Sequence, residues 1–157
     1  MGVLELSNVV SRDLIVVQSK SKNKGEILEE LTKLLYQNGD ISDIDDFLED
    51  VYLREDEGVT AIGQGIAIPH GKSSSVINTR VAVAKLEQSI KWEGIYDEDE
   101  DVDVVILFAV RDVDANTNHV LLLQQVAIFL ADDDFIKELH QVENVEELYQ
   151  LLVKKGE

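Results

Sequence analysis

Apolar and polar positions in the first sixty residues predict one strand followed by two helices. The short β-branched run at 13–18 is typical of a strand. Apolar residues then recur at helical spacing after Asn23, a residue suited to open a helix, and the pattern stops at Gly39. A second amphipathic pattern over 44–52, with Gly58 beyond its end, predicts the next helix.

The middle of the chain predicts short strands around an irregular segment. Between residues 58 and 71 the periodicity disappears and glycine becomes frequent. Residues 66–68 suggest a short strand with Pro69 at its edge or end, because proline cannot donate a ladder hydrogen bond. The run at 80–86 predicts a further strand, and the almost wholly apolar run at 102–110 predicts a strand buried on both faces.

Two features lie between these last two strands. The acidic run at 97–103 is interpreted as a solvated loop. Trp92 is interpreted as an apolar plug at the end of a strand.

The last third of the chain is predicted to be helical. His119 and apolar residues as far as Leu130 share one face, with Asn116 or Asn118 available as the cap. A short helix is expected over 133–140 and another over 145–155, the latter opened by Asn144 with Glu147 three residues later. Helices before and after the strands predict an α+β fold of three layers, α/β/α, with a small mixed sheet flanked by helices on both faces. A chain of 157 residues, with no linker or repeat, predicts a single domain over 1–157.

Charge and composition restrict the function. The formal net charge is −18, so a phosphate backbone would be repelled and nucleic acid is not an expected partner. The charge would favour encounter with a basic protein, but the commoner role of such acidity is to keep a cytoplasmic protein soluble. The longest apolar run, 104–110, is far short of a membrane span, and no secretory signal is present. The expected location is therefore the cytoplasm, without direct membrane insertion. The sequence contains no cysteine, which removes disulfides, thiolate zinc sites and cysteine nucleophiles.

The stretch "GQGIAIPHGKS" at 63–73 has a superficial likeness to a nucleotide phosphate loop. Five residues separate Gly65 from Gly71, where the Walker pattern needs four, and no helical pattern follows Ser73. A nucleotide site is therefore not expected there.

The sequence does not support a metal site either. The acids from Asp97 onward have the alternation of a calcium loop, but Val102 replaces the turn glycine and Phe108 replaces the bidentate glutamate. His70 and His119 are 49 residues apart, without a short histidine pair. We expect no metal and no cofactor.

His70 is the candidate nucleophile. A neutral imidazole near pH 7 can attack phosphorus directly, provided that the ring is accessible and oriented. Pro69 restricts the backbone before it, and Gly71 is expected to let the chain turn after it, which predicts an exposed ring. A histidine among glycines is more often a loop residue without a catalytic role, so both interpretations stand at this point.

Two further residues could assist His70. His119 is predicted in the first turn of its helix, where free amides favour an anion. Arg54, near the end of the second helix, is the best-placed cation for phosphoryl charge. Lys72 and His140 are interpreted as solvated surface residues.

The segments "REDEGVTAIGQGIAIPHGK" (54–72) and "ADDDFIKELHQVENVEELYQLL" (131–152) resemble the enzyme IIA domain of the fructose–mannitol family of the bacterial sugar phosphotransferase system. The likeness extends from the first strand to the last helix. Ala61 and Val120 depart from the usual family pattern and leave the candidate site residues unchanged, whereas Arg111 replaces a proline often seen after the central strand and bears on the path of the following loop.

The resemblance implies a phosphotransferase that works through a phosphohistidine. His70 would accept a phosphoryl group from the phosphocarrier protein HPr and donate it to a cysteine of enzyme IIB, with His119 and Arg54 assisting at the phosphate. Because the sequence has no cysteine, enzyme IIB is expected on a separate chain. The alternative is a nitrogen-related regulatory enzyme IIA, in which phosphorylation of the same His70 would control binding to partner proteins. The segment after "IPH" favours the transport role.

Overall fold

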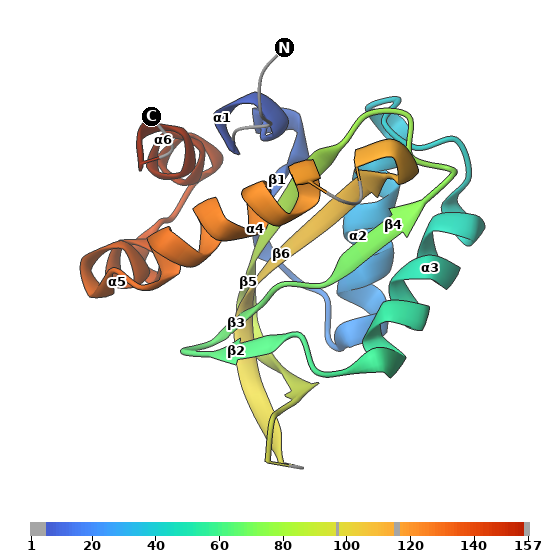
Figure 1. Ribbon diagram of the computed structural model, residues 1–157. Helices are drawn as coiled ribbons and strands as arrows, with labels where there is room; N and C mark the ends of the chain where they lie inside the picture. Colours follow the sequence, from blue (N-terminus) through green and yellow to red (C-terminus); the bar gives the residue numbers. More distant parts are fainter. Residues whose placement is uncertain (1–5, 97, 115–116, 156–157) are drawn as a thin grey trace.

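The computed structural model describes residues 6–96, 98–114 and 117–155, in which a mixed sheet separates two layers of helices (Figure 1). Helices α2 (Lys24–Gln37) and α3 (Ile44–Glu57) cover one face of the sheet. The other face is covered by α1 (Leu6–Val9), α4 (Thr117–Leu130), α5 (Asp133–Gln141) and α6 (Val145–Lys155). Short 3-10 turns stand at Arg12–Leu14 and Asp112–Asp114. The predicted three-layer α+β fold is confirmed.

Within the described residues, six strands form the sheet. They are β1 (Ile15–Ser19), β2 (Ala61–Gly63), β3 (Ile66–Ala67), β4 (His70–Ser73), β5 (Arg80–Glu93) and β6 (Asp99–Arg111). The order is β1-β5-β6-β3-β2, with β4 also paired to β6. β5 runs antiparallel to β6, and β2 runs antiparallel to β3. β1 runs parallel to β5, and both β3 and β4 run parallel to β6. The sheet is therefore mixed, as predicted.

The two long central strands divide the hydrophobic core into two halves. Along β6, Val105 and Leu107 face the core under α2 and α3, whereas Val104 and Ile106 face the core under α4, α5 and α6. Because successive side chains of a strand point to opposite faces, a strand apolar at every position must be covered twice. The expectation for 102–110 is confirmed.

The helix boundaries follow the predicted caps. The side-chain oxygen of Asn23 accepts a hydrogen bond from the amide of Glu26, and that of Asn144 accepts from Glu147. Gly39 follows α2 with a φ of +80°, a conformation that glycine adopts without strain. For α4, Asn118 lies inside the helix and Asn116 falls outside the described residues. No helix in the described part of the chain is long and apolar enough to cross a membrane.

Strands β3 and β4 behave as one strand interrupted at Pro69. Ala67 pairs with Val105 and His70 pairs with Phe108, so the pairing with β6 keeps the same offset on both sides of the break. Proline lacks an amide hydrogen, which ends the ladder locally, but its carbonyl oxygen still accepts from the amide of Phe108 at 3.0 Å. The expected strand end at Pro69 is found, and the register continues through it.

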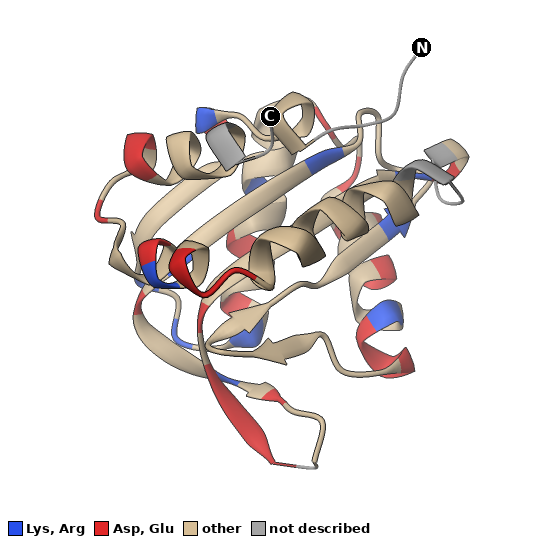
Figure 2. Ribbon diagram, turned by 60° about the vertical axis from the view of Figure 1, so that its left-hand side comes forward, with Lys and Arg blue, Asp and Glu red and all other residues tan. Residues whose placement is uncertain are grey.

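The acidic run is not the loop that the sequence predicted. Residues 99–103 belong to β6, and Asp99–Val102 pair with Glu93–Ile90 of β5, so β5 also continues past the expected end at 86. The resulting hairpin projects from the body with acids along β6 (Figure 2). Trp92 anchors it: the indole is 1% exposed and donates to Thr60 Oγ1 at 3.0 Å. Val102 is buried between Asp101 and Asp103, and Asp101 pairs across the ribbon with Lys91, whose ammonium donates to its carboxylate at 2.7 Å. These are strand features within a polar composition.

Candidate functional site

His70 is the first residue of β4 and is held between the sheet and two helices. Its ring stacks on Phe108, its partner across the strand pair, with centroids 5.0 Å apart and planes 24° apart. The residue is 7% exposed, so the expectation of a surface-exposed ring is wrong. The reason is the register: continuing the pairing with β6 through Pro69 draws His70 into the sheet. It is nevertheless accessible, because the ring borders two cavities.

The first cavity, here called the charged pocket, has a volume of about 350 Å³. The structure brings the three candidate residues together there: His70 from β4, Arg54 from α3 and His119 from the first turn of α4. The two imidazole centroids lie 5.2 Å apart. Arg54 Nη1 donates to the carbonyl oxygen of Gly58 at 3.1 Å, which fixes the guanidinium at the end of α3.

Lys72, Asp50 and Glu57 also line the charged pocket, and the sequence interpretation missed them. Lys72 follows His70 by two residues, so both side chains lie on the same face of β4. That alternation was hidden because the segment was interpreted as irregular. Asp50 and Glu57 lie four residues before and three after Arg54, a helical spacing that places them beside it.

Burial and positive charge set the protonation of both histidines. The pKa of His70 is lowered from 6.5 to about 3, first by burial and then by the nearby charges of His119 and Arg54. The pKa of His119 is lowered by burial, then by Lys72 and Arg54. Both rings are therefore neutral near pH 7, which leaves a lone pair available on each.

Two ring nitrogens are buried without a hydrogen-bond partner among the described residues: Nδ1 of His70 and Nε2 of His119. Nδ1 of His70 is closed to solvent, whereas Nε2 of that ring is not among the buried unpartnered atoms. An unpaired buried nitrogen costs free energy, and a ligand that supplied an acceptor or donor would remove that cost.

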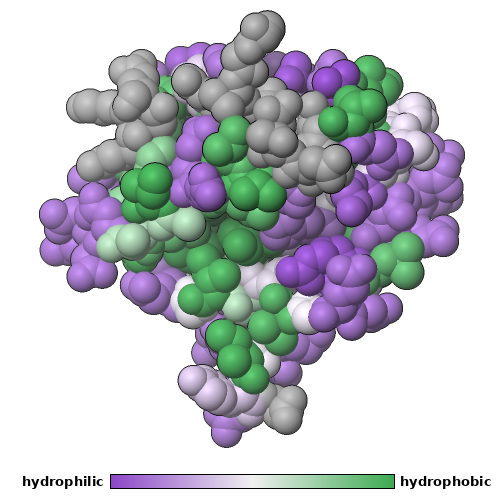
Figure 3. Space-filling view, in the orientation of Figure 1, coloured by the Kyte–Doolittle hydropathy of each residue, from purple (hydrophilic) through white to green (hydrophobic). Residues whose placement is uncertain are grey.

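The second cavity is an apolar groove of about 480 Å³ on the other side of His70. Its apolar lining is Ile62, Ile68, Leu123, Val126, Ala127, Leu130 and Ala131. Apolar side chains gather on the surface over α4 and below it towards β2 (Figure 3). An apolar surface of this kind beside a reactive group is suited to a protein partner.

Gly71 serves packing and not a turn. It lies within β4, and a Cβ added there would stand 2.4 Å from Cε1 of Phe47 and 2.8 Å from Cγ2 of Val51. The expectation that Gly71 lets the chain turn after His70 is therefore wrong. Glycine at this position allows α3 to approach β4, and so brings Arg54 to His70.

His140 is not the solvated residue that the sequence suggested. Its side chain is 29% exposed and contacts Asp103 of β6 and the backbone of Gln64 in the β2–β3 turn. Nothing in the local sequence signals this contact, because the three residues come from distant elements.

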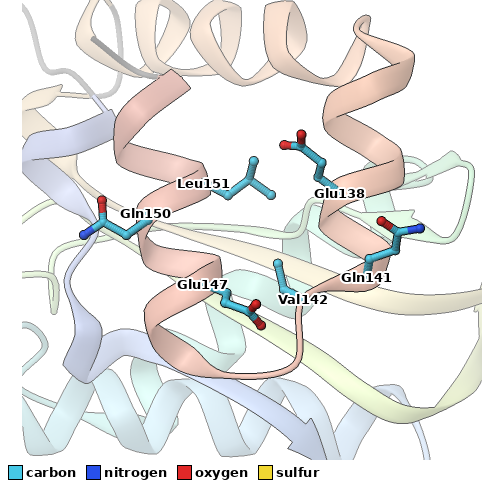
Figure 4. Close-up of a pocket in the computed structure, with 6 residues that line it drawn as sticks. All are labelled: Glu138, Gln141, Val142, Glu147, Gln150 and Leu151. Atoms are coloured by element: carbon cyan, nitrogen blue, oxygen red, sulfur yellow. The ribbon is translucent and has the colours of Figure 1, made fainter.

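A further cavity, of about 430 Å³, lies between α5 and α6 (Figure 4). Leu151 and Glu138 point into the space between the helices, whereas Gln150 points away. Glu147 Oε1 already accepts from the amide of Glu143 at 2.8 Å. The cavity is lined by no imidazole and no cation, so it offers no nucleophile. Across the described ranges, no group of three or more His, Asp or Glu side chains is arranged to hold a metal ion.

Comparison with known proteins gives concordant matches over nearly the whole chain. The family model "Phosphoenolpyruvate-dependent sugar phosphotransferase system, EIIA 2" matches residues 8–155. The chain is 36% identical over 154 residues to the PTS system 2-O-alpha-mannosyl-D-glycerate-specific EIIABC component of Escherichia coli (strain K12), covering 98% of this chain and 23% of that protein. It is 32% identical over 156 residues to the Nitrogen regulatory protein of Klebsiella oxytoca, covering 99% of this chain and 94% of that one.

The fold is shared with solved structures. One is the complex of enzyme IIAMTL and phosphorylated enzyme IIBMTL from Escherichia coli, with a TM-score of 0.76, 21% identity, and coverage of 92% of this chain and 96% of that one. At 21% identity this match shows only that the fold is shared.

Proposed function

This chain belongs to the EIIA 2 family of the phosphoenolpyruvate-dependent sugar phosphotransferase system, and on that premise we propose that His70 carries a phosphoryl group between two partner proteins. The observation that supports the proposal most directly is the charged pocket, where a neutral, buried imidazole faces a second imidazole, a guanidinium and an ammonium.

The first transfer is written between two imidazoles. Nε2 of His70 attacks the phosphorus of phosphorylated HPr, a new P–N bond forms, and the donor's P–N bond breaks with its electron pair returning to the donor ring. Nε2 is the reacting atom because Nδ1 is closed to solvent. The bond broken and the bond formed are of the same kind, so the site needs positioning and charge neutralisation more than a driving force.

The surrounding groups suit the added charge. Arg54 and Lys72 would offset the phosphoryl charge, since charge-assisted contacts to phosphate are among the stronger hydrogen bonds in proteins. A phosphoryl group on His70 would also bring acceptor oxygens next to Nε2 of His119, which has no partner among the described side chains and backbone. Asp50 and Glu57 at the same pocket would meet basic residues of a protein donor.

The second transfer would pass the phosphoryl group to a thiolate of enzyme IIB, with a P–S bond formed and the P–N bond of His70 broken. The E. coli relative is by name an EIIABC component, and a structural neighbour is a complex of a IIA with a phosphorylated IIB. The acceptor cysteine lies outside this sequence, which contains none. The apolar groove beside His70 is the surface that we assign to these partners.

Labelling tests this proposal. Incubation with enzyme I, HPr and labelled phosphoenolpyruvate should give an acid-labile label on the protein, located on Nε2 of a single histidine by NMR. His70→Ala should take up no label, while the exposed-site control Lys137→Ala should label fully. Label retained by His70→Ala would refute the assignment.

A regulatory role is the second candidate, because the chain covers nearly all of a nitrogen regulatory protein at 32% identity. In that role phosphorylation of His70 would control partner binding, and no sugar would be involved. Chasing the phosphorylated protein with the cognate enzyme IIB separates the two: loss of phosphate to the IIB cysteine supports transport, and retention supports regulation.

A further inference from the structure

An enclosed carboxylate in the last turn of α3 follows Arg54 directly but does not line the charged pocket. The side chain of Glu55 is 5% exposed, and its Oε1 lies 2.5 Å from Nζ of Lys24, the first residue of α2. Its Oε2 accepts a hydrogen bond from the hydroxyl of Thr60 at 2.6 Å. Both oxygens of this carboxylate are therefore held by donors from other segments of the chain.

Thr60 extends this contact to the projecting hairpin. The indole nitrogen of Trp92 donates to Thr60 Oγ1 at 3.0 Å. Since an indole N–H can only donate, the hydroxyl accepts from Trp92 and directs its own hydrogen to Glu55. The ammonium of Lys24 also lies 5.0 Å from the centroid of the Trp92 ring. These four side chains, here called the Glu55 network, join α2, α3, the segment before β2, and β5.

The position of Glu55 calls for a carboxylate. An ammonium and a hydroxyl hydrogen both point at it, so the side chain must offer an acceptor on each of its two terminal atoms. A glutamine of nearly the same shape has an oxygen at one atom and an NH₂ at the other, which would set a donor against a donor. In an enclosed place the unsatisfied groups cost more than the loss of an exposed ion pair would. Glu55→Gln is therefore a small change in shape that disrupts the network.

The network holds the short segment that fixes the guanidinium of the site. Arg54 Nη1 donates to the carbonyl oxygen of Gly58 at 3.1 Å, just beyond the end of α3. Glu55 and Thr60 stand on either side of Gly58 in the chain, and the hydrogen bond between them closes a loop around it. The place of the Gly58 carbonyl, and with it that of Arg54, therefore depends on this loop staying closed.

The same threonine is joined to the strand that leads to the nucleophile. The carbonyl oxygen of Thr60 accepts from the amide of Ile68 at 2.9 Å, two residues before His70. Thr60 is thus tied by its side chain to the helix that carries Arg54, and by its backbone to the segment that carries His70. A break in the network would let these two walls of the charged pocket move relative to each other.

We propose that Glu55 is a positioning residue for phosphoryl transfer, which fixes Arg54 relative to His70 through the Glu55 network. The carboxylate itself touches neither the phosphoryl group nor the partner protein in this role. A guanidinium that neutralises charge in the transition state must be held in place, and a displacement of about 1 Å can cost roughly a hundredfold in rate. This inference rests on the proposed function, because Arg54 acts on the phosphoryl group there.

Transfer kinetics test the positioning role. With phosphorylated HPr as donor in rapid-quench labelling, Glu55→Gln should lower kcat roughly tenfold and change KM much less, because the transition state is affected more than partner docking. Asp56→Asn, which removes an exposed carboxylate at the next position of α3, should match the wild type. Circular dichroism checks that each variant is folded. An unchanged kcat in folded Glu55→Gln, or a change confined to KM, would overturn the proposal.

A double-mutant cycle separates an effect through Arg54 from a general loosening of the fold. In an Arg54→Gln background, Glu55→Gln should lower kcat by less than about twofold further, because the guanidinium that it positions is already gone. A loss of the same size in both backgrounds would show that Glu55 acts independently of Arg54, and the proposal would fail.

Two variants of Thr60 test the path. Thr60→Val keeps the shape of the side chain but removes the hydroxyl, so it should slow transfer as Glu55→Gln does. Thr60→Ser keeps the hydroxyl and should keep kcat near the wild-type value. Equal losses in the two variants would show that the hydrogen bond to Glu55 is not what holds the segment.

Hydrogen exchange examines the network without any partner. The amide of Ile68 donates to the carbonyl oxygen of Thr60, and the amide of Phe108 donates to that of Pro69 at 3.0 Å. In Glu55→Gln the protection of Ile68 should fall roughly fivefold relative to that of Phe108, about the loss of one hydrogen bond. An unchanged ratio would refute the network's hold on this segment. If the wild type takes up no label from phosphorylated HPr, the proposed function fails and the positioning role fails with it, whereas the exchange ratio still decides whether the network holds.

Discussion

Acidification should destabilise the folded protein through His70 in particular. The folded-state pKa of about 3 lies below the unfolded value of 6.5, so between these limits only the unfolded chain binds the proton. The contribution of His70 to the free energy of unfolding is therefore fully present above pH 6.5, and it is lost as the pH falls towards 3. At 1.36 kcal/mol per pH unit, moving from pH 6.5 to 5 costs about 2 kcal/mol.

The perturbation that isolates this term is His70→Gln, which keeps a neutral polar side chain and does not titrate. Urea unfolding, followed by circular dichroism at pH 7 and pH 5 and constant ionic strength, gives both free energies for both proteins. These conditions stay above the sequence pI of about 4.3, where solubility is lowest. We expect the stability advantage of wild type over variant to fall by about 2 kcal/mol between the two pH values.

The comparison cancels the contributions of groups that do not interact with His70, because these are the same in both proteins. An advantage that stays constant within about 0.5 kcal/mol would mean that folded His70 accepts a proton as readily as the unfolded chain does. The burial argument for a neutral nucleophile would then be wrong.

Two further predictions concern the walls of the pocket. Gly71→Ala should lower the free energy of unfolding by about 1–3 kcal/mol in urea, because the new Cβ would lie 2.4 Å from Phe47 Cε1. Gly58→Ala should lower it much less, because a Cβ at Gly58 would have no atom within 4 Å. Lys72→Gln should slow phosphoryl uptake in rapid-quench labelling by roughly fivefold, since unit charges about 4 Å apart interact by about 1 kcal/mol even in water; equal rates for this variant and Lys137→Gln would show that Lys72 takes no part.

The helical layers could be predicted because their information is local. Caps such as Asn23 and Asn144 and the 3.6-residue apolar period act within one or two turns, and the structure confirms them. The buried strand could be predicted as well, because residues 104–110 are apolar at every position.

What the sequence failed to predict depends on pairing between distant segments. The acids at 99–101 form a strand only because β5 lies opposite, held by Trp92 and Thr60. The burial of His70 needs the register with β6, and the contact of His140 needs both α5 and the turn at Gln64. None of these partners is near in the chain, so composition alone pointed to a loop or to solvent.

The continuous register through Pro69 limits which changes of length the segment before His70 can accept. Side chains alternate along a strand, so deleting one residue between Ala67 and His70 would move the imidazole to the opposite face. It would then meet Phe47 and Val51, where even a methyl group does not fit. We therefore expect insertions and deletions to be tolerated in the projecting β5–β6 hairpin. Insertions and deletions between residues 66 and 70 should abolish phosphorylation. The number of residues between β3 and His70 is therefore constrained in this protein, whichever side chains occupy those positions.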